Sequence, residues 1–328
     1  MEKIGITTTI PIEILIAGKV KPLDLNNIFI TSGKCSKYIE DAESLGFPRT
    51  TCSWIKGIYS ACLKLKLNRI IAVTQGDCSN THALMETLQM ADVNVIPFAY
   101  PYAKDKQFLQ HEIQKLLDLF NVKIDYVNDV KYFIDNNIRE KLRLIDMATW
   151  QNNLVRGEEN HYFLVNSSDF KGNIYKFRTE INKFLNNLSK RKPIKNKIRI
   201  GYIGVPSVFS DLYEYIENLG GHTVFNEIQR QFSMPYSTSD IIEQYLAYTY
   251  PYSIFERIED INNAVAERKI HGIINYVQTF CFRHIEDIVL RQKINIPMLT
   301  IEGDKPGKLD ARTKIRIETF MQMLKQNI

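Results

Sequence analysis

RIIAVTQGDCSNTHALMETLQM, residues 69–90, contains in one stretch the pattern on which the expected fold depends. Its opening RIIAVT (69–74) is mostly apolar and β-branched, which is typical of a strand buried on both faces of a parallel sheet. The polar segment QGDCSN then predicts a turn, and THALMETLQM predicts a helix. This stretch therefore predicts a strand, a turn that carries Cys78, and a helix.

The same alternation of strands and helices extends in both directions along the chain. Pro11 predicts the start of a helix that Gly18 ends, because proline favours the first turn of a helix and glycine the position after the last. A long region at 104–190 is predicted to be mostly helical, and the alternation restarts after it. The predicted strands are 4–10, IFIT (28–31), 69–74, 93–101, one within 197–207 that leads into a glycine turn, 222–227, 271–280 and 296–304.

Alternating strands and helices favour a parallel sheet with helices on both faces. We therefore expect an α/β fold with two doubly wound domains of the Rossmann or flavodoxin type. At 328 residues the chain is long enough for two such domains, since one domain typically has roughly 100–200 residues. We place an N-terminal domain with a helical extension at 1–195 and a C-terminal domain at 196–328.

The composition is that of an ordinary globular protein, with 45% hydrophobic and 24% charged residues. The net charge is +5, but basic and acidic residues are interspersed, and no groove-reading motif accompanies the charge, so no nucleic-acid partner is expected. No apolar stretch approaches the roughly 18 residues of a membrane span, and the N-terminus lacks the pattern of a signal peptide. We expect a cytoplasmic protein without a membrane partner.

Three of the five cysteines lie where a strand or turn is predicted to give way to a helix. They are Cys52, Cys78 and Cys281. Helix N-termini carry free N–H groups and partial positive charge, which favour the thiolate that binds metal. A cysteine in such a position is also often a small buried hydrophobe, and there is no C-x-x-C pair, so both interpretations stay open. Cys62 lies within a predicted helix, where packing is favoured, and Cys35 is ambiguous.

Two histidines follow these cysteines within one helical turn, His82 after Cys78 and His284 after Cys281. Such pairs suit zinc, for example with Cys78, His82 and Cys281 as ligands, although solvent-facing histidines are favoured. A Cys–His nucleophile lacks an identified third group. EGDKPGKLD (302–310) departs from a P-loop in spacing and in its last residue, so no ATP site is expected. The aromatic run YLAYTYPYSIF (245–255) predicts either a pocket or dimer face, or core packing.

Four segments follow one another along the chain: IGITTTIPIEILIAG, CSWIKGIYSA, QGDCSNTHALMETL, and VQTFCFRHIEDIVL with the later IPMLTIEGD and RIETFMQML. In their order and spacing they resemble the 2-hydroxyacyl-CoA dehydratase component family. The first segment matches the family's strand that leads to V-P-x-E and a helix, with Pro11 and Glu13 at the matching positions. The other three match the segments of the family's first, second and third ligand cysteines. YTYPYSIFER and the three-threonine opening resemble the double-cubane cluster branch of this family.

The resemblance implies two similar α/β domains with an iron–sulfur cluster in the cleft between them. The ligands would be Cys52, Cys78 and Cys281. The cluster would be a 4Fe–4S cubane, or a bridged double cubane that needs further ligands from Cys35, Cys62 or a partner chain. Members of the family receive low-potential electrons from a separate ATP-hydrolysing activator that carries its own 4Fe–4S cluster. A homodimer or a related second subunit is expected.

On this basis we expect an iron–sulfur reductase component that reduces a small-molecule substrate. Thr8, Glu13 and His82 are candidates for catalytic groups near the cluster that supply protons. One alternative is a subunit of a radical (R)-2-hydroxyacyl-CoA dehydratase, in which the segment with Gly157 and Glu158 would face the substrate. An alternative of another class is a protein that binds a metal or cluster without turnover.

Overall fold

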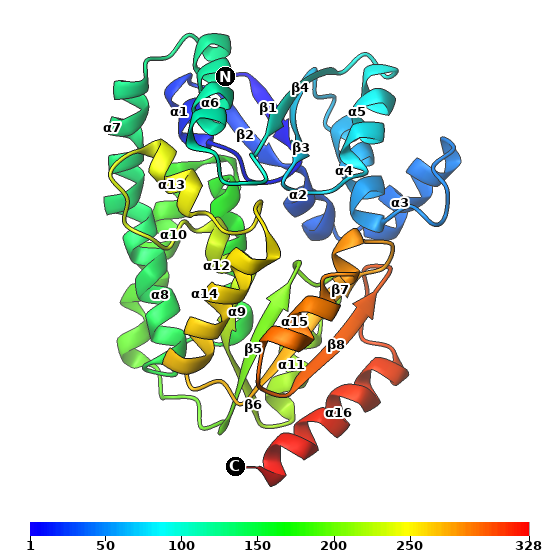
Figure 1. Cartoon of the computed structure of the whole chain (residues 1–328), viewed down its shortest axis with the longest axis vertical. Coiled ribbons are helices and arrows are strands. Elements are labelled where there is room, and N and C mark those ends of the chain that lie inside the picture. Colours follow the sequence, from blue (N-terminus) through cyan, green and yellow to red (C-terminus); the bar gives the residue numbers. More distant parts are fainter. Residues whose placement is uncertain (328) are drawn as a thin grey trace. The chain divides into compact units, whose positions relative to one another are not determined.

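The computed structural model describes residues 1–327 and contains two four-stranded parallel sheets, each flanked by helices (Figure 1). The first sheet has the strand order β2-β1-β3-β4, and the second has the order β6-β5-β7-β8. Every neighbouring pair is parallel. The two orders are the same when the numbering is shifted by four, so both sheets have one topology. The predicted α/β class with two doubly wound sheets is confirmed.

The first half of the chain forms the first sheet and most of the long helices. Its elements are β1 (Lys3–Ile6), α1 (Ile12–Ala17), β2 (Lys21–Asp24), α2 (Leu25–Thr31), α3 (Cys35–Ser44), α4 (Ser53–Lys64), β3 (Arg69–Gln75), α5 (Thr81–Gln89), β4 (Asn94–Ala99), α6 (Lys106–Phe120), α7 (Ile124–Ile134), the π-helical η1 (Asp135–Arg139), α8 (Glu140–Trp150), α9 (Gly157–Val165), η2 (Asn166–Ser168), η3 (Phe170–Gly172), α10 (Ile174–Asn186) and η4 (Leu188–Lys190).

The second half of the chain forms the second sheet. Its elements are β5 (Ile198–Gly204), α11 (Leu212–Asn218), β6 (Gly221–Asn226), α12 (Glu227–Phe232), α13 (Ile241–Ala247), α14 (Ile254–Glu267), β7 (Gly272–Gln278), η5 (Phe282–His284), α15 (Asp287–Lys293), β8 (Met298–Gly303) and α16 (Ala311–Gln326).

The first sheet is covered on both faces because its central strand β3 is apolar on both sides. Ile70 and Ala72 share one hydrophobic cluster with residues of α4 and α5. Neighbouring residues of a strand point to opposite faces, so the equally buried Ile71 and Val73 face the other side, where α1 and α6 pack. The run at 69–74 is therefore apolar because its strand is buried on both faces, as the sequence predicts.

The second sheet is built in the same way. Ile273 on β7 shares a hydrophobic cluster with residues of α14 and α15. On the opposite face, a side chain added at Gly272 would meet Phe320 and Leu324 of α16 at 2.9 and 2.7 Å. Glycine at this position therefore lets α16 pack close to the strand. Helices thus cover both faces, as in the first sheet.

Packing divides the chain into two compact units, each made of several segments. Unit 1 comprises residues 1–140, 166–179 and 234–253, and unit 2 comprises the remaining described residues. Unit 1 thus contains the first sheet and the short helix α13, and unit 2 contains the second sheet. The domain boundary that the sequence predicts after residue 195 stays a prediction.

The predicted strand IFIT (28–31) is wrong, because these residues belong to helix α2. The second strand of the sheet is instead Lys21–Asp24. Asp24 begins the helix, since its carboxylate accepts hydrogen bonds from the backbone N–H groups of Asn26 and Asn27. The β-branched residues of this segment favour a strand only weakly, and the cap together with the burial of Phe29 outweighs that preference.

None of the helices described for residues 1–327 combines the length and the apolar character that a membrane span requires.

Candidate functional site

The reversal of strand order in each sheet marks where a ligand site is expected. In the first sheet β1 and β3 lie side by side at this reversal, and in the second sheet β5 and β7 do. Loops that leave the carboxyl ends of such a strand pair diverge to opposite faces and leave a crevice. Cys78 lies in the loop after β3, and Cys281 lies in the loop after β7. The two cysteines therefore occupy equivalent positions in their sheets.

A short internal repeat in the sequence also places the two cysteines at equivalent positions. Residues 69–78 and 272–281 align without a gap, and both have Ile-Ile at the second and third positions, Gln at the seventh and Cys at the tenth. The aligned residues form β3 and β7 with the loops that follow them. This repeat is a signal that the motif-based sequence analysis missed, and it pairs Cys78 with Cys281 independently of any family.

Cys52 directly precedes helix α4 and is buried, with 7% of its surface exposed. One turn further on, the ammonium group of Lys56 is also buried and donates hydrogen bonds to the carboxylate of Glu43 at 2.7 Å and to the backbone carbonyl of Arg49 at 3.0 Å. The carbonyl of Arg49 belongs to the loop that leads to Cys52. Lys56 therefore fixes this loop against α3 and α4, a role that sequence reasoning missed.

Cys78 shares a hydrophobic cluster with Cys52, since both pack with residues of α4 and α5 in unit 1. Its loop is held by the aromatic run at 245–255. Gly76 has φ +98°, and a side chain added there would lie 2.7 Å from Cβ of Pro251. The hydroxyl of Tyr250 donates a hydrogen bond to the carboxylate of Asp77 at 2.8 Å. The Cys78 loop therefore has its shape because this segment packs directly against it.

The aromatic run itself is part of the core of unit 1. Tyr245, Tyr248 and Tyr252 are buried and surround the ring of Tyr100, with ring centroids 6.0 to 6.5 Å from it. The hydroxyl of Tyr100 in turn donates to the carbonyl of Thr9 in the loop after β1 at 2.9 Å. Of the two interpretations offered by the sequence, core packing is confirmed for this cluster.

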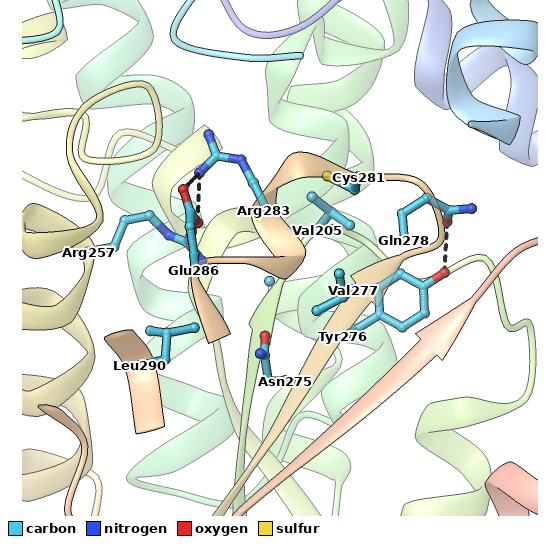
Figure 2. A pocket seen from close by; sticks show the side chains of 11 residues that line it. Val205, Arg257, Asn275, Tyr276, Val277, Gln278, Cys281, Arg283, Glu286 and Leu290 are labelled. Carbon is cyan, nitrogen blue, oxygen red and sulfur yellow. Dashed lines mark hydrogen bonds and ion pairs between the residues drawn. The ribbon is translucent and has the colours of Figure 1, made fainter. Parts of the chain in front are cut away.

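Cys281 lies at the rim of a pocket in unit 2, beyond the carboxyl ends of β5 and β7 (Figure 2). The thiol is half-buried. The pocket combines apolar side chains with two arginines, one glutamate and two amides. It is lined by Gly204, Val205, Arg257, Asn275, Tyr276, Val277, Gln278, Cys281, Arg283, Glu286 and Leu290.

A chain of ion pairs connects the walls of this pocket. Arg257 on α14 donates two hydrogen bonds to Glu227, at 2.6 and 3.0 Å, and one to Glu286 at 2.8 Å. Arg283, two residues after Cys281, donates to both oxygens of Glu286 at 3.2 and 3.3 Å. Figure 2 shows Glu286 between the two guanidinium groups. Burial alone would lower the pKa of Arg257, but the charges of Glu227 and Glu286 and the hydrogen bonds to Glu227 together raise it.

Glu13 is fully buried in unit 1, and both of its carboxylate oxygens are engaged. One oxygen accepts hydrogen bonds from Arg139 at 2.5 Å and from Gln244 at 2.7 Å. The other lies 2.9 Å from the hydroxyl of Tyr245, which is also 2.7 Å from the carbonyl of Ile10. This network fastens α1 and the loop before it to η1 and α13. The predicted role of Glu13 in proton supply stays a prediction.

The other two predicted proton donors are placed differently. Thr8 is buried in the loop between β1 and α1, at the strand reversal of the first sheet. His82 is exposed in the first turn of α5, and its Nε2 lies 3.1 Å from the carbonyl of Thr74. His284 is exposed as well. Among residues 1–327, no group of three or more His, Cys, Asp or Glu side chains is arranged to hold a metal ion.

The remaining two cysteines have local roles. Cys62 is fully buried within α4, and burial raises the pKa of its thiol to about 11, which disfavours the thiolate. The predicted packing role of Cys62 is confirmed. The thiol of Cys35 lies 3.3 Å and 3.5 Å from the carbonyl oxygens of Phe29 and Ile30, so it contributes to the end of α2. None of the five cysteines forms a disulfide bond.

Comparison with known proteins decides the family. A family model described as "2-hydroxyglutaryl-CoA dehydratase, D-component" matches residues 7–324. The chain belongs to this dehydratase component family. No curated protein matches the chain. The matched residues include the segments of all three cysteines, so the family that the motifs resemble is confirmed.

The residues of this dehydratase family member fit an iron–sulfur cluster in the chemistry of their donors. Thiols outside disulfides follow β3 and β7 and precede α4. Two buried hydroxyl groups of unit 1 have no hydrogen-bond partner among the described residues, namely those of Thr9 in the loop after β1 and of Thr81 at the start of α5. Thr81 begins the helix that follows Cys78, and donors of this kind tune clusters by hydrogen bonds to sulfur.

Proposed function

We propose that this dehydratase family member binds an iron–sulfur cluster through Cys52, Cys78 and Cys281, and that it passes single low-potential electrons to a small substrate. The cluster is a 4Fe–4S cubane or a bridged double cubane. The observation that carries the proposal is the repeated placement of Cys78 and Cys281 after β3 and β7, at the strand reversals of two sheets with one topology. Cys52, at the start of a helix that packs with the Cys78 loop, completes the set.

When bound, such a cluster accepts one electron at a time and donates it again. The chain's own residues orient the thiols and set their surroundings. Backbone N–H groups in the first turns of α4 and α5 favour the anionic sulfur of Cys52 and Cys78. Lys56 lies one turn beyond Cys52 and fixes the preceding loop through its hydrogen bonds to Glu43 and to the carbonyl of Arg49. Thr8, Glu13 and His82 of unit 1 are the proposed groups for proton supply.

We assign the energy input to a separate protein. The segment 302–310 departs from a P-loop, so we propose that an ATP-hydrolysing activator with its own 4Fe–4S cluster reduces this chain by one electron at a time. The proposed assembly is a homodimer or a pair with a related second subunit.

A second candidate function is supported by the description of the family model itself. In that case the chain is a subunit of a 2-hydroxyacyl-CoA dehydratase, a lyase rather than a net reductase. The segment with Gly157 and Glu158 would then face the substrate. In the structure Gly157 begins α9, and a side chain added there would lie 2.5 Å from Cβ of Thr223. Packing against β6 therefore already explains this glycine. Binding of an acyl-CoA to the reduced protein, measured by calorimetry, separates the two candidates.

The deciding experiment is strictly anaerobic purification and reconstitution, followed by counts of iron and acid-labile sulfide. We expect both elements, a visible absorption band that bleaches on reduction, and an EPR signal in the reduced state. A colourless chain without iron contradicts the proposal. Zinc in place of iron and sulfide supports the zinc alternative. A cluster that is never oxidised or reduced in the presence of activator, ATP and substrate supports a binding role without turnover.

A further inference from the structure

The loop that carries Cys281 follows its strand through short-range backbone hydrogen bonds: the N–H of Cys281 donates to the carbonyl of Gln278, and that of His284 to the carbonyl of Cys281, both at 3.1 Å. After β7 ends, the chain passes through Phe280 with φ +65°, a left-handed conformation that is rare for an aromatic residue. Only the three-residue turn η5 follows before α15. Phe280, Phe282 and Ile285 are 49%, 41% and 71% exposed, so they contribute little packing. Beyond these backbone contacts, a charged side chain connects the residues after Cys281 to another helix of unit 2, since Glu286 accepts a hydrogen bond from Arg257 of α14.

The ion-pair chain beside Cys281 reaches from this loop to the sheet. At one end, the backbone N–H of Gly204, the last residue of β5, donates to Glu227 at 3.0 Å. The same carboxylate receives the two hydrogen bonds from Arg257. At the other end, Glu286 accepts from both Arg257 and Arg283. Arg257 is therefore the central link between the end of β5 and Glu286, which in turn pairs with Arg283 inside η5.

Stability alone gives a weak reason for this arrangement, because a buried ion pair often contributes no more than apolar residues of the same size. Unit 2 contains a buried arginine for comparison. Arg268 is as buried as Arg257 and donates to both oxygens of Asp146, at 2.6 and 2.9 Å. Its guanidinium also lies over the rings of Trp150 and Phe225. None of these groups belongs to the loop of Cys281.

We propose that Arg257 is a positioning residue that holds the loop of Cys281, through Glu286 and Arg283, in the conformation in which the thiol binds iron. This inference rests on the proposed function for the ligand role of Cys281. Arg257 does not itself bind the cluster. Its fork-shaped guanidinium bonds two carboxylates at once, which a lysine cannot reproduce.

The first test uses the full-length chain without a cluster and measures how fast iodoacetamide alkylates each cysteine, by peptide mass spectrometry. In Arg257→Gln we expect the rate at Cys281 to rise by about tenfold, because hydrogen bonds between charged groups shift local opening by about that factor. The rate at Cys78 in the same sample should stay unchanged. Arg257→Lys should give an intermediate rate at Cys281.

Two further variants exclude a general loss of structure. Arg268→Gln removes the comparison ion pair and should leave the rate at Cys281 unchanged. Glu286→Gln keeps the shape of the side chain, leaves the pair of Arg257 and Glu227 intact, and should raise the rate at Cys281 even if Arg257→Gln does not fold. An unchanged rate at Cys281 in Glu286→Gln, or an equal rise at Cys78 and Cys281, overturns the inference.

The second test uses the reconstituted protein. Arg257→Gln and Glu286→Gln should release iron to a chelator faster than the unaltered chain and should show an altered EPR spectrum, whereas Arg268→Gln should do neither. Iron counting on the unaltered chain tests the proposed function separately. If that chain holds iron but the two variants match it in spectrum and release, only the positioning role fails. If it holds none, the ligand role of the loop fails with the proposed function.

Discussion

Cys78 follows β3 in unit 1, and Cys281 follows β7 in unit 2, each three residues beyond a strand that ends in glutamine. The first loop is shaped by close packing of Gly76 against Pro251 and by one hydrogen bond from Tyr250. The second is linked by Arg283 and Glu286 to the buried Arg257. Two sheets of the same topology thus carry a cysteine at the same position, but different contacts hold the two loops. Strand order decides where the cysteine lies, and the neighbouring helices and segments decide how it is held.

The largest expected effect comes from removing the thiols. Cys78→Ser and Cys281→Ser should each abolish stable iron binding, as should Cys52→Ser, because each removes one proposed ligand. Cys62→Ser should keep iron and lose only stability, since its thiol is buried in the core. Iron counting after anaerobic reconstitution checks this. Retention of iron in Cys281→Ser alone would break the equivalence of the two loops.

Next in size is a change that exploits the different packing of the two loops. Gly76→Ala should cost about 2–4 kcal/mol, because Gly76 has positive φ and the added methyl group would collide with Pro251. The aligned position in the other loop is Thr279, and Thr279→Ala should cost less than about 1 kcal/mol, as is usual for partly exposed positions. Denaturant unfolding measures both. Equal costs would mean that the loops are supported alike.

The stabilities of the two units should change in opposite directions with pH. In unit 1, burial and the charge of Asp24 raise the pKa of Asp169 to about 7. In unit 2, burial lowers the pKa of His161 to about 4.

Between about pH 4 and 7 the unfolded chain has an ionised Asp169 while the folded chain keeps it protonated, so the contribution of unit 1 to stability falls as pH rises. For His161 the unfolded chain binds the extra proton, so the contribution of unit 2 rises over about pH 4–6.5. Hydrogen exchange of amides in each sheet, compared at two pH values within this window, checks the signs. Asp169→Asn and His161→Gln should each remove the trend of their own unit.

The smallest effect is expected from Tyr250→Phe, which deletes one hydrogen bond to the Cys78 loop. We expect a loss of about 1 kcal/mol and a modest rise in the alkylation rate of Cys78, with Cys281 unaffected. This is the counterpart of the Arg257 variants in the other loop. A larger effect on Cys281 than on Cys78 would contradict the assignment of separate supports.

Several features of the fold and the candidate site could be predicted because they depend on local pattern. The apolar run 69–74, the proline and glycine around α1, and the position of Cys52 before α4 are all found as expected. The strand at 28–31 was mispredicted because its β-branched residues resemble a strand, while the cap at Asp24 starts a helix. The glutamates and arginines of unit 2 gave no comparable signal, because Glu227 and Arg257 are thirty positions apart.

The sequence by itself determined the alternation of strands and helices, the family, and the placement of cysteines just before predicted helices. These features depend on short-range periodicity, helix caps and the order of motifs. Only the tertiary structure decided that Glu13 is fully engaged by Arg139, Gln244 and Tyr245, that the aromatic run supports the Cys78 loop, and that Arg257 links β5 to the Cys281 loop. These contacts join residues far apart in the chain, and their energies arise from burial and charge pairing that exist only after the units have packed.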